Sequence, residues 1–163
     1  MSVFKSQFAR ALRVIPSDYC NIPFPEKVID GVNISVFQDS LITAPPINFI
    51  TSNVAVGDIV YNITDGLAAT VINVVSENVL ELNYNAFANV GADFIIYAAS
   101  PQTSIGVQGC NLYASGGESS AVKVTTLGQD EVILPVGTTA VIPVQVTKVH
   151  ATGTTATSII ALW

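Results

Sequence analysis

Short apolar runs separated by turn residues recur along most of the chain. Between Val28 and about Ser100 they are rich in Val and Ile, which favour strands. The runs are Val54–Val56, Ile59–Ile63, Ala69–Val75, Val79–Leu82 and Phe94–Ala98. Within Ile59–Ile63, alternation places Ile59, Tyr61 and Ile63 on one face of the expected strand. Strands repeating about every ten residues predict a small β-barrel or β-sandwich.

The turns between these runs carry the residues that tight turns need. Thr64-Asp65-Gly66 is the strongest, because Asp supplies a local hydrogen bond and Gly a positive φ. Further turns are expected at Gly57–Asp58, Ser76–Asn78 and Val90–Asp93. We therefore read residues 28–100 as one compact antiparallel unit.

The last third of the chain predicts a second β module of the same kind. The module resumes at Ile105–Tyr113, strands are expected over Ile142–Val149 and Ser158–Trp163, and turns at Gly116-Gly117 and Pro135–Thr138. Because unpaired chain ends fray, a chain that ends on an apolar strand favours pairing of that strand in a sheet. The alternative is that Trp163 covers one end of a barrel.

The N-terminal segment has two possible structures. Phe4, Phe8, Leu12 and Ile15 are spaced by about four residues, which allows a short amphipathic helix; an extended arm that orders on a neighbour is the alternative. The following segment Pro16–Pro25 contains three prolines. It is expected to form an extended strap.

Composition limits the function classes. Half of the 163 residues are hydrophobic and 11% are charged, with a mean hydropathy of +0.53. This composition excludes intrinsic disorder, and the apolar runs are too short for a transmembrane helix. A surface with so few charges indicates contact with partners, and we expect homo-oligomers.

Charge is unevenly distributed. Lys5, Arg10, Arg13 and Lys27 are four of the six basic residues, and the net charge is −6. An acidic body repels phosphates, so no nucleic acid partner is expected. The basic arm suits an acidic protein surface, although an unbalanced terminus without a role is an equal alternative.

Cysteine usage points to a reducing compartment. Cys20 and Cys110 are the two cysteines, too few for a disulfide framework. The N-terminus lacks the apolar core and cleavage site of a secretory signal. We expect synthesis in a cytoplasm and free thiols.

Candidate chemical groups are sparse. His150, the single histidine, has no acidic residue near it in sequence and is expected on a strand surface, beside Lys148, Val146 and Val144. Asp58, Asp65 and Asp93 fall in turns, where aspartates serve mainly backbone hydrogen bonding. The remaining acids flank turns and indicate no paired carboxylates. We expect no enzyme activity, cofactor or metal.

The C-terminal pattern resembles a known family. The landmarks are LYASGG at Leu112–Gly117, the turn Pro135–Thr138, the strand Ile142–Val149 and ATGTTATSIIALW at Ala151–Trp163. They are similar to the C-terminal module of head-spike base proteins of bacteriophages and gene transfer agents. The resemblance implies a virion structural protein.

A second resemblance concerns the middle of the chain. The stretches Asn48–Leu82, with GDIVYN and TDG before ATV, and VGADFIIY at Val90–Tyr97 look like a small β-barrel unit that recurs in phage structural proteins. In the spike-base family the counterpart of Arg13–Pro25 often runs almost directly into that of LYASGG. The resemblance therefore implies that 28–100 is an inserted β-barrel, and that the arm and strap 1–27 pack with a β-sandwich over 101–163.

Together these patterns predict an all-β protein of two small antiparallel sandwich or barrel modules, one inserted into the other, behind an N-terminal arm. The expected function is that of a virion protein, made in the host cytoplasm, that self-assembles and docks on other virion proteins as a head spike or fibre base or as capsid decoration. The expected assembly residues are Phe4, Phe8, Arg10, Arg13 and Trp163. The alternative is a glycan-binding β-sandwich on a phage surface.

Overall fold

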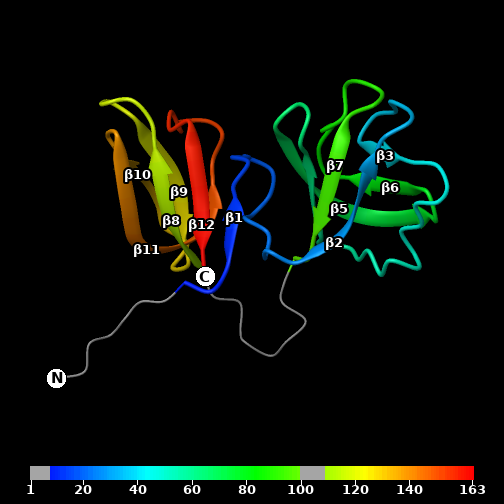
Figure 1. Cartoon of the computed structure of the whole chain (residues 1–163), viewed down its shortest axis with the longest axis horizontal. Helices are drawn as coiled ribbons and strands as arrows, with labels where there is room; N and C mark the ends of the chain where they lie inside the picture. Colours follow the sequence, from blue (N-terminus) through cyan, green and yellow to red (C-terminus); the bar gives the residue numbers. More distant parts are fainter. Residues whose placement is uncertain (1–7, 100–108) are drawn as a thin grey trace.

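The structure, a computed structural model, describes residues 8–99 and 109–163. In these residues the chain forms twelve strands and no helix, and the strands make two antiparallel sheets of six (Figure 1). The prediction of an all-β fold with two small β modules is confirmed. No helix in the described part is long and apolar enough to cross a membrane.

The barrel module is built from one contiguous stretch of chain. Its strands are β2 (Lys27–Val32), β3 (Ser40–Ile42), β4 (Ile59–Asn62), β5 (Leu67–Ser76), β6 (Val79–Leu82) and β7 (Asp93–Tyr97), in the order β2-β7-β4-β5-β6-β3. Two register shifts between β5 and β6 bend the sheet around its core. The largest fully buried core side chains include Phe49, Phe87, Phe94, Leu41 and Leu80.

The sandwich module takes strands from both sides of the barrel module in sequence. Its strands are β1 (Ala11–Arg13), β8 (Cys110–Ser115), β9 (Ala121–Thr126), β10 (Glu131–Pro135), β11 (Thr139–Val149) and β12 (Ser158–Leu162), in the order β1-β12-β8-β11-β9-β10. The first half of β11 pairs with β8 and its second half with β9, across register shifts after Ile142 and Val146. These shifts let one strand serve both layers around a core of Leu112, Val122, Val124, Val146 and Ala161.

The N-terminal segment is a strand where a helix was one expectation. From residue 8 onward the helix prediction is wrong, because Ala11–Arg13 pairs with β12, with Leu12 opposite Ala161. Residues 1–7, which include Phe4, lie outside the described residues. Val54–Val56 is also not a strand and forms irregular chain that leads into a turn.

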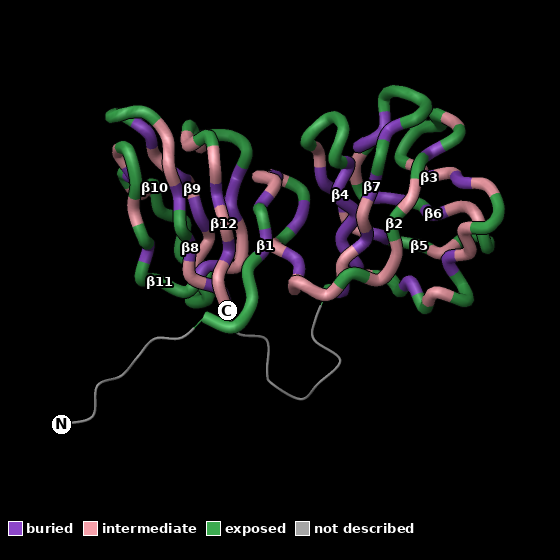
Figure 2. Tube along the Cα trace, viewed as in Figure 1, coloured by how far each residue is buried: buried purple, intermediate pink, exposed green. Residues whose placement is uncertain are grey.

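A third apolar cluster lies between the two modules. Leu12 and Cys20 pack with Ile59, Tyr61 and Ala68 of the barrel module, and Ile15, Tyr97 and Trp163 flank them. The alternation expected in β4 is present: Val60 faces the barrel core, and Ile59 and Tyr61 face the opposite way. All four β4 residues are nevertheless buried, because Leu12 and Cys20 cover the face of Ile59 and Tyr61. Figure 2 shows buried segments in both modules, including β4.

Candidate interaction surfaces

The residues expected at an assembly interface separate into two groups. The Arg10 guanidinium lies 5.2 Å from the centroid of the Phe24 ring, and Trp163 meets the same ring edge-on at 5.8 Å. The Trp163 amide also donates to the Arg10 carbonyl. Arg10 and Trp163 therefore tie the last strand to the strap. Phe8 and Arg13 are exposed and take no part in these contacts between Arg10, Phe24 and Trp163.

The strap Pro16–Pro25 connects both modules through its backbone. On the sandwich side, the Ser17 amide donates to Val149 O and the Ile22 amide to Thr147 O, each at 2.9 Å. On the barrel side, Asn83 Nδ2 donates to Tyr19 O at 2.8 Å. The strap is thus held by hydrogen bonds to both modules.

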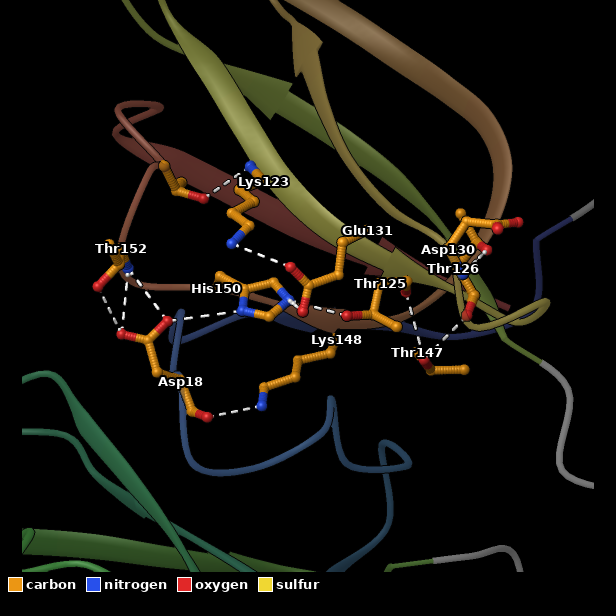
Figure 3. A network of polar contacts seen from close by, with 11 residues as sticks. Asp18, Lys123, Thr125, Thr126, Asp130, Glu131, Thr147, Lys148, His150 and Thr152 are labelled. Atoms are coloured by element: carbon orange, nitrogen blue, oxygen red, sulfur yellow. Dashed lines mark hydrogen bonds and ion pairs between the residues drawn. The ribbon is translucent and has the colours of Figure 1, made fainter.

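His150 lies at the centre of a polar network, shown in Figure 3. Its Nε2 is 2.8 Å from Thr125 Oγ1 and 3.8 Å from Glu131 Oε1, and its Nδ1 is 3.6 Å from Asp18 Oδ1. The side chain is only 7% exposed. The expectation of a strand-surface histidine is wrong, because His150 follows the end of β11 and is buried. The strap and β10 bring to it two carboxylates that are distant in sequence.

The other contacts of Asp18 complete the attachment of the strap. Thr152 donates to its carboxylate from the backbone amide and from Oγ1, and Lys148 Nζ donates to its backbone carbonyl at 2.6 Å. The hydrogen bond from the Thr152 hydroxyl is the main cause that holds the pKa of Asp18 below its usual value; burial opposes it, and the Thr152 amide, His150 and Lys148 add to the lowering. This carboxylate is therefore stabilised in its charged form.

Thr125, His150 and Asp18 stand in the order of a nucleophile, a base and an orienting acid. The geometry does not support that chemistry. The 3.6 Å between Nδ1 and Oδ1 exceeds a hydrogen bond, and the Asp18 oxygens already accept from Thr152. None of the three residues lines the cleft described next. We interpret the network as a structural one that holds the strap against the sandwich module.

An open cleft of about 310 Å³ lies between the modules. Its walls are mainly apolar or uncharged, and Arg13 is the one Lys, Arg, Asp or Glu among its lining residues. The lining residues are Leu12, Arg13, Val14, Ile15, Pro16, Tyr61, Ile63, Gly66, Tyr97, Ala156, Thr157 and Ile159. Such a cleft suits an apolar group that carries or adjoins a negative charge.

A second surface is an apolar tip on the barrel module, made of residues 32–37 and Val90. Five of its side chains are exposed: Val32, Ile34, Val36, Phe37 and Val90. Asn33, which is buried, joins the two loops by donating to Asn89 O and accepting from the Ala92 amide. Exposed apolar groups gathered on an ordered surface mark a site of interaction.

The outer edge of β10 is a third surface. Thr126 N donates to Asp130 O and Val136 N to Ser120 O, so in this antiparallel ladder the even-numbered β10 residues face β9. The backbone groups of Glu131 and Ile133 consequently point outward. Pro135 offers no N–H to an added strand, and the charge of Glu131 also disfavours strand addition. Proline and charged residues are two common protections of a sheet edge.

Charge separates the modules. The barrel module, taken from the start of β2 as residues 27–99, contains seven carboxylates and one Lys, a formal charge of −6. Because the whole chain also carries −6, the remainder is formally neutral. The cleft residue Arg13 belongs to this remainder, whereas the apolar tip belongs to the acidic module.

The turn aspartates and the cysteines have structural surroundings. Asp58 accepts from the amides of Ala55 and Ala99, and Asp65 accepts from Asn62. In residues 8–99 and 109–163 no group of three or more His, Cys, Asp or Glu is placed to hold a metal ion. Cys20 and Cys110 are free and buried, and burial raises both thiol pKa values, that of Cys110 to about 12.

The chain matches no protein-family model, no curated protein and no solved structure in the comparisons made. The surfaces described above are therefore the basis for a functional proposal.

Sequence reasoning missed the apolar tip and the cleft. A signal for the tip was present, because VNISVF at Val32–Phe37 concentrates four large apolar residues in a segment of six. The cleft had no such signal. Its walls come from four separate segments that meet only in the folded chain.

Proposed function

We propose that this protein is a bacteriophage virion structural protein that self-assembles and docks on the particle. It would serve as a head spike or fibre base, or as capsid decoration, and be made in the host cytoplasm. The observation that carries the proposal is the uncovered apolar tip on a chain of which only 11% is charged. A protein that spends its life assembled has a partner for such a surface.

The resemblances noted in the sequence supply the kind of assembly. LYASGG occupies the end of β8 and the turn after it, and ATGTTATSIIALW contains β12, which pairs with β1 on one side and β8 on the other. GDIVYN and TDG form β4 and its turn, where Gly66 has a φ of +67°. These motifs therefore occupy framework positions, as expected for a scaffold that presents surfaces instead of an active site.

The proposed mechanism is burial of apolar surface between copies and against neighbouring virion proteins. The protein has no catalytic role in this proposal. The acidic barrel module disfavours contact with nucleic acid phosphates, so the partners are proteins.

The experiment that tests this function is detection of the chain in particles. Particles released from cells that carry the gene are purified by density and probed with an antibody against the chain, followed by immunogold electron microscopy. The proposal expects co-sedimentation and labelling at one position on the particle. Absence of the chain from particles, with the chain recovered in the soluble fraction, would overturn it.

Glycan binding on a phage surface is a second candidate, and one observation favours it. Tyr19 of the strap and Tyr84 of the barrel module stack at 4.0 Å with an interplanar angle of 10°, and Tyr19 is exposed. A ring face of this kind can receive a sugar. Glycan-array binding that disappears in Tyr19→Ala would support this candidate, and an array without signal would dismiss it.

A further inference from the structure

The apolar tip presents one aromatic side chain on a well-fixed turn. Phe37 is 67% exposed, the highest value for a large apolar side chain among the described residues. Ser40 N donates to Phe37 O at 3.1 Å, Leu82 N to Asp39 O at 2.6 Å, and Ile34 N to Ile42 O at 2.9 Å. The ring is therefore held out by a hydrogen-bonded turn, which lowers the entropic cost of inserting it into a partner.

An acid accompanies this ring. Asp39 is exposed and follows Phe37 by two residues, with a φ of 52°, a conformation that Asp tolerates better than most residues. The turn thus presents an aromatic group and a carboxylate together.

The cleft between the modules has the complementary character. Its volume of about 310 Å³ exceeds the roughly 150 Å³ that suffices to bind benzene in an apolar protein cavity. Arg13 is the charged side chain at its wall. An aromatic ring with a neighbouring carboxylate matches both the apolar walls and this cation.

The two features cannot meet within one chain. The tip immediately precedes β3, whereas the cleft is lined by β1 and the residues after it. Figure 1 shows β3 on the far side of the barrel module from β1. The occupant of the cleft must therefore come from a different molecule.

We propose that Phe37 of one copy inserts into the intermodule cleft of a second copy, where Asp39 lies beside Arg13. The inference rests on the proposed self-assembly and names its interface. The local charges favour it, because Asp39 beside the tip meets a cleft in which Arg13 is the one Lys, Arg, Asp or Glu among the lining residues. Since the two surfaces differ, the contact is head-to-tail, and repetition closes into a ring or continues as a filament.

Disulfide trapping between two different variants tests this contact. One chain carries Gln38→Cys, next to the intact ring, and the other Ile63→Cys, an exposed residue on the cleft wall. The native cysteines are buried and contribute little background. Under mild oxidation we expect a cross-linked dimer when the two proteins are mixed, and much less from either alone.

Matched controls make the result specific. Val75→Cys is 57% exposed on the barrel module but does not line the cleft, and it replaces Ile63→Cys in a parallel mixture. Equal yields from both mixtures, or cross-linking of Gln38→Cys with itself, would overturn the proposal. The latter result would mean tip-to-tip contact.

The ring and the charge are then tested separately. Phe37→Ser should raise the dissociation constant between copies by roughly 30-fold, as for loss of a central aromatic contact. Val56→Ser, at 65% exposure in the same module, should leave the constant unchanged. Asp39→Asn keeps the turn conformation accessible and should reduce the salt dependence of association.

The outcomes separate this inference from the proposed function. An oligomer that persists unchanged in Phe37→Ser overturns the contact and leaves self-assembly in place. A chain that is monomeric alone overturns the contact between copies, whereas its presence or absence on particles decides the virion role independently.

Discussion

Replacing Tyr61 with Phe should stabilise the protein. The Tyr61 side chain is 2% exposed, and its hydroxyl is the one buried side-chain N or O atom in the described residues that lacks a hydrogen bond. The Ile15 amide lies near enough to act on the pKa of the phenol but does not satisfy the hydroxyl. Since an unsatisfied buried polar group costs about 1–3 kcal/mol, Tyr61→Phe should raise the free energy of unfolding by about 1 kcal/mol.

The gain should grow at high pH. Burial raises the pKa of Tyr61 far above its ordinary value of 10.0. The unfolded state therefore loses its proton above pH 10 while the folded state keeps it, and wild-type stability falls as pH rises. At one pH unit above the ordinary pKa, this effect lowers the free energy of unfolding of wild type by about 1.4 kcal/mol. The Phe variant has no titrating group at this position and keeps its stability there. The difference between the proteins should rise from about 1 to about 2.4 kcal/mol.

Urea unfolding followed by fluorescence measures this difference. Trp163 is the single tryptophan and flanks the same apolar cluster, so its emission reports on the interface that contains Tyr61. Tyr113→Phe, at a partly exposed residue of the sandwich module, is the control and should show no such change. A Tyr61→Phe variant that is less stable than wild type, or a difference that stays constant with pH, would show that the Tyr61 hydroxyl is not an unsatisfied buried group.

Three further outcomes are expected. Asp18→Asn should loosen the strap and speed hydrogen exchange of the Ser17 and Ile22 amides. Because the pKa of Asp18 is lowered in the folded state, the contribution of this carboxylate to stability is present above pH 3.8 and is lost as the pH falls through the folded pKa. The stabilities of the two proteins should therefore converge in acid. Deleting Ile159–Trp163 removes β12 from between β1 and β8 and should abolish the cooperative thermal transition of the sandwich module; a retained transition in calorimetry would show that β12 is dispensable. Leu80→Ala, at a fully buried site in the barrel core, should cost about 2–5 kcal/mol in urea unfolding, and a loss below 1 kcal/mol would contradict the packing described.

The sequence predicted elements whose signals are local. Thr64-Asp65-Gly66 forms the expected turn because Asp65 N donates to Asn62 Oδ1 and Gly66 takes a positive φ. The strand before it shows the expected alternation. That both faces of this strand are buried could not be predicted, because Leu12 and Cys20 on the second face come from a segment about 40 residues earlier.

The errors also have physical causes. The spacing of Phe8, Leu12 and Ile15 fits a helix, but pairing with β12 satisfies the backbone of Ala11–Arg13 as a strand. His150 has no acidic neighbour in sequence, and the strap carries Asp18 to it across the sandwich module. In both cases a long-range contact outweighs the local pattern.

Self-assembly of the chain can be measured as the mass of the purified protein in solution. Light scattering over a range of concentrations should be run on wild type, on Phe37→Ser and on a chain lacking residues 1–7. This deletion is preferred to a longer one because the residues from Ala9 onward hydrogen-bond with the last strand. We expect a homo-oligomer for wild type and a smaller mass for Phe37→Ser. A wild-type chain that is monomeric at every concentration would contradict self-assembly.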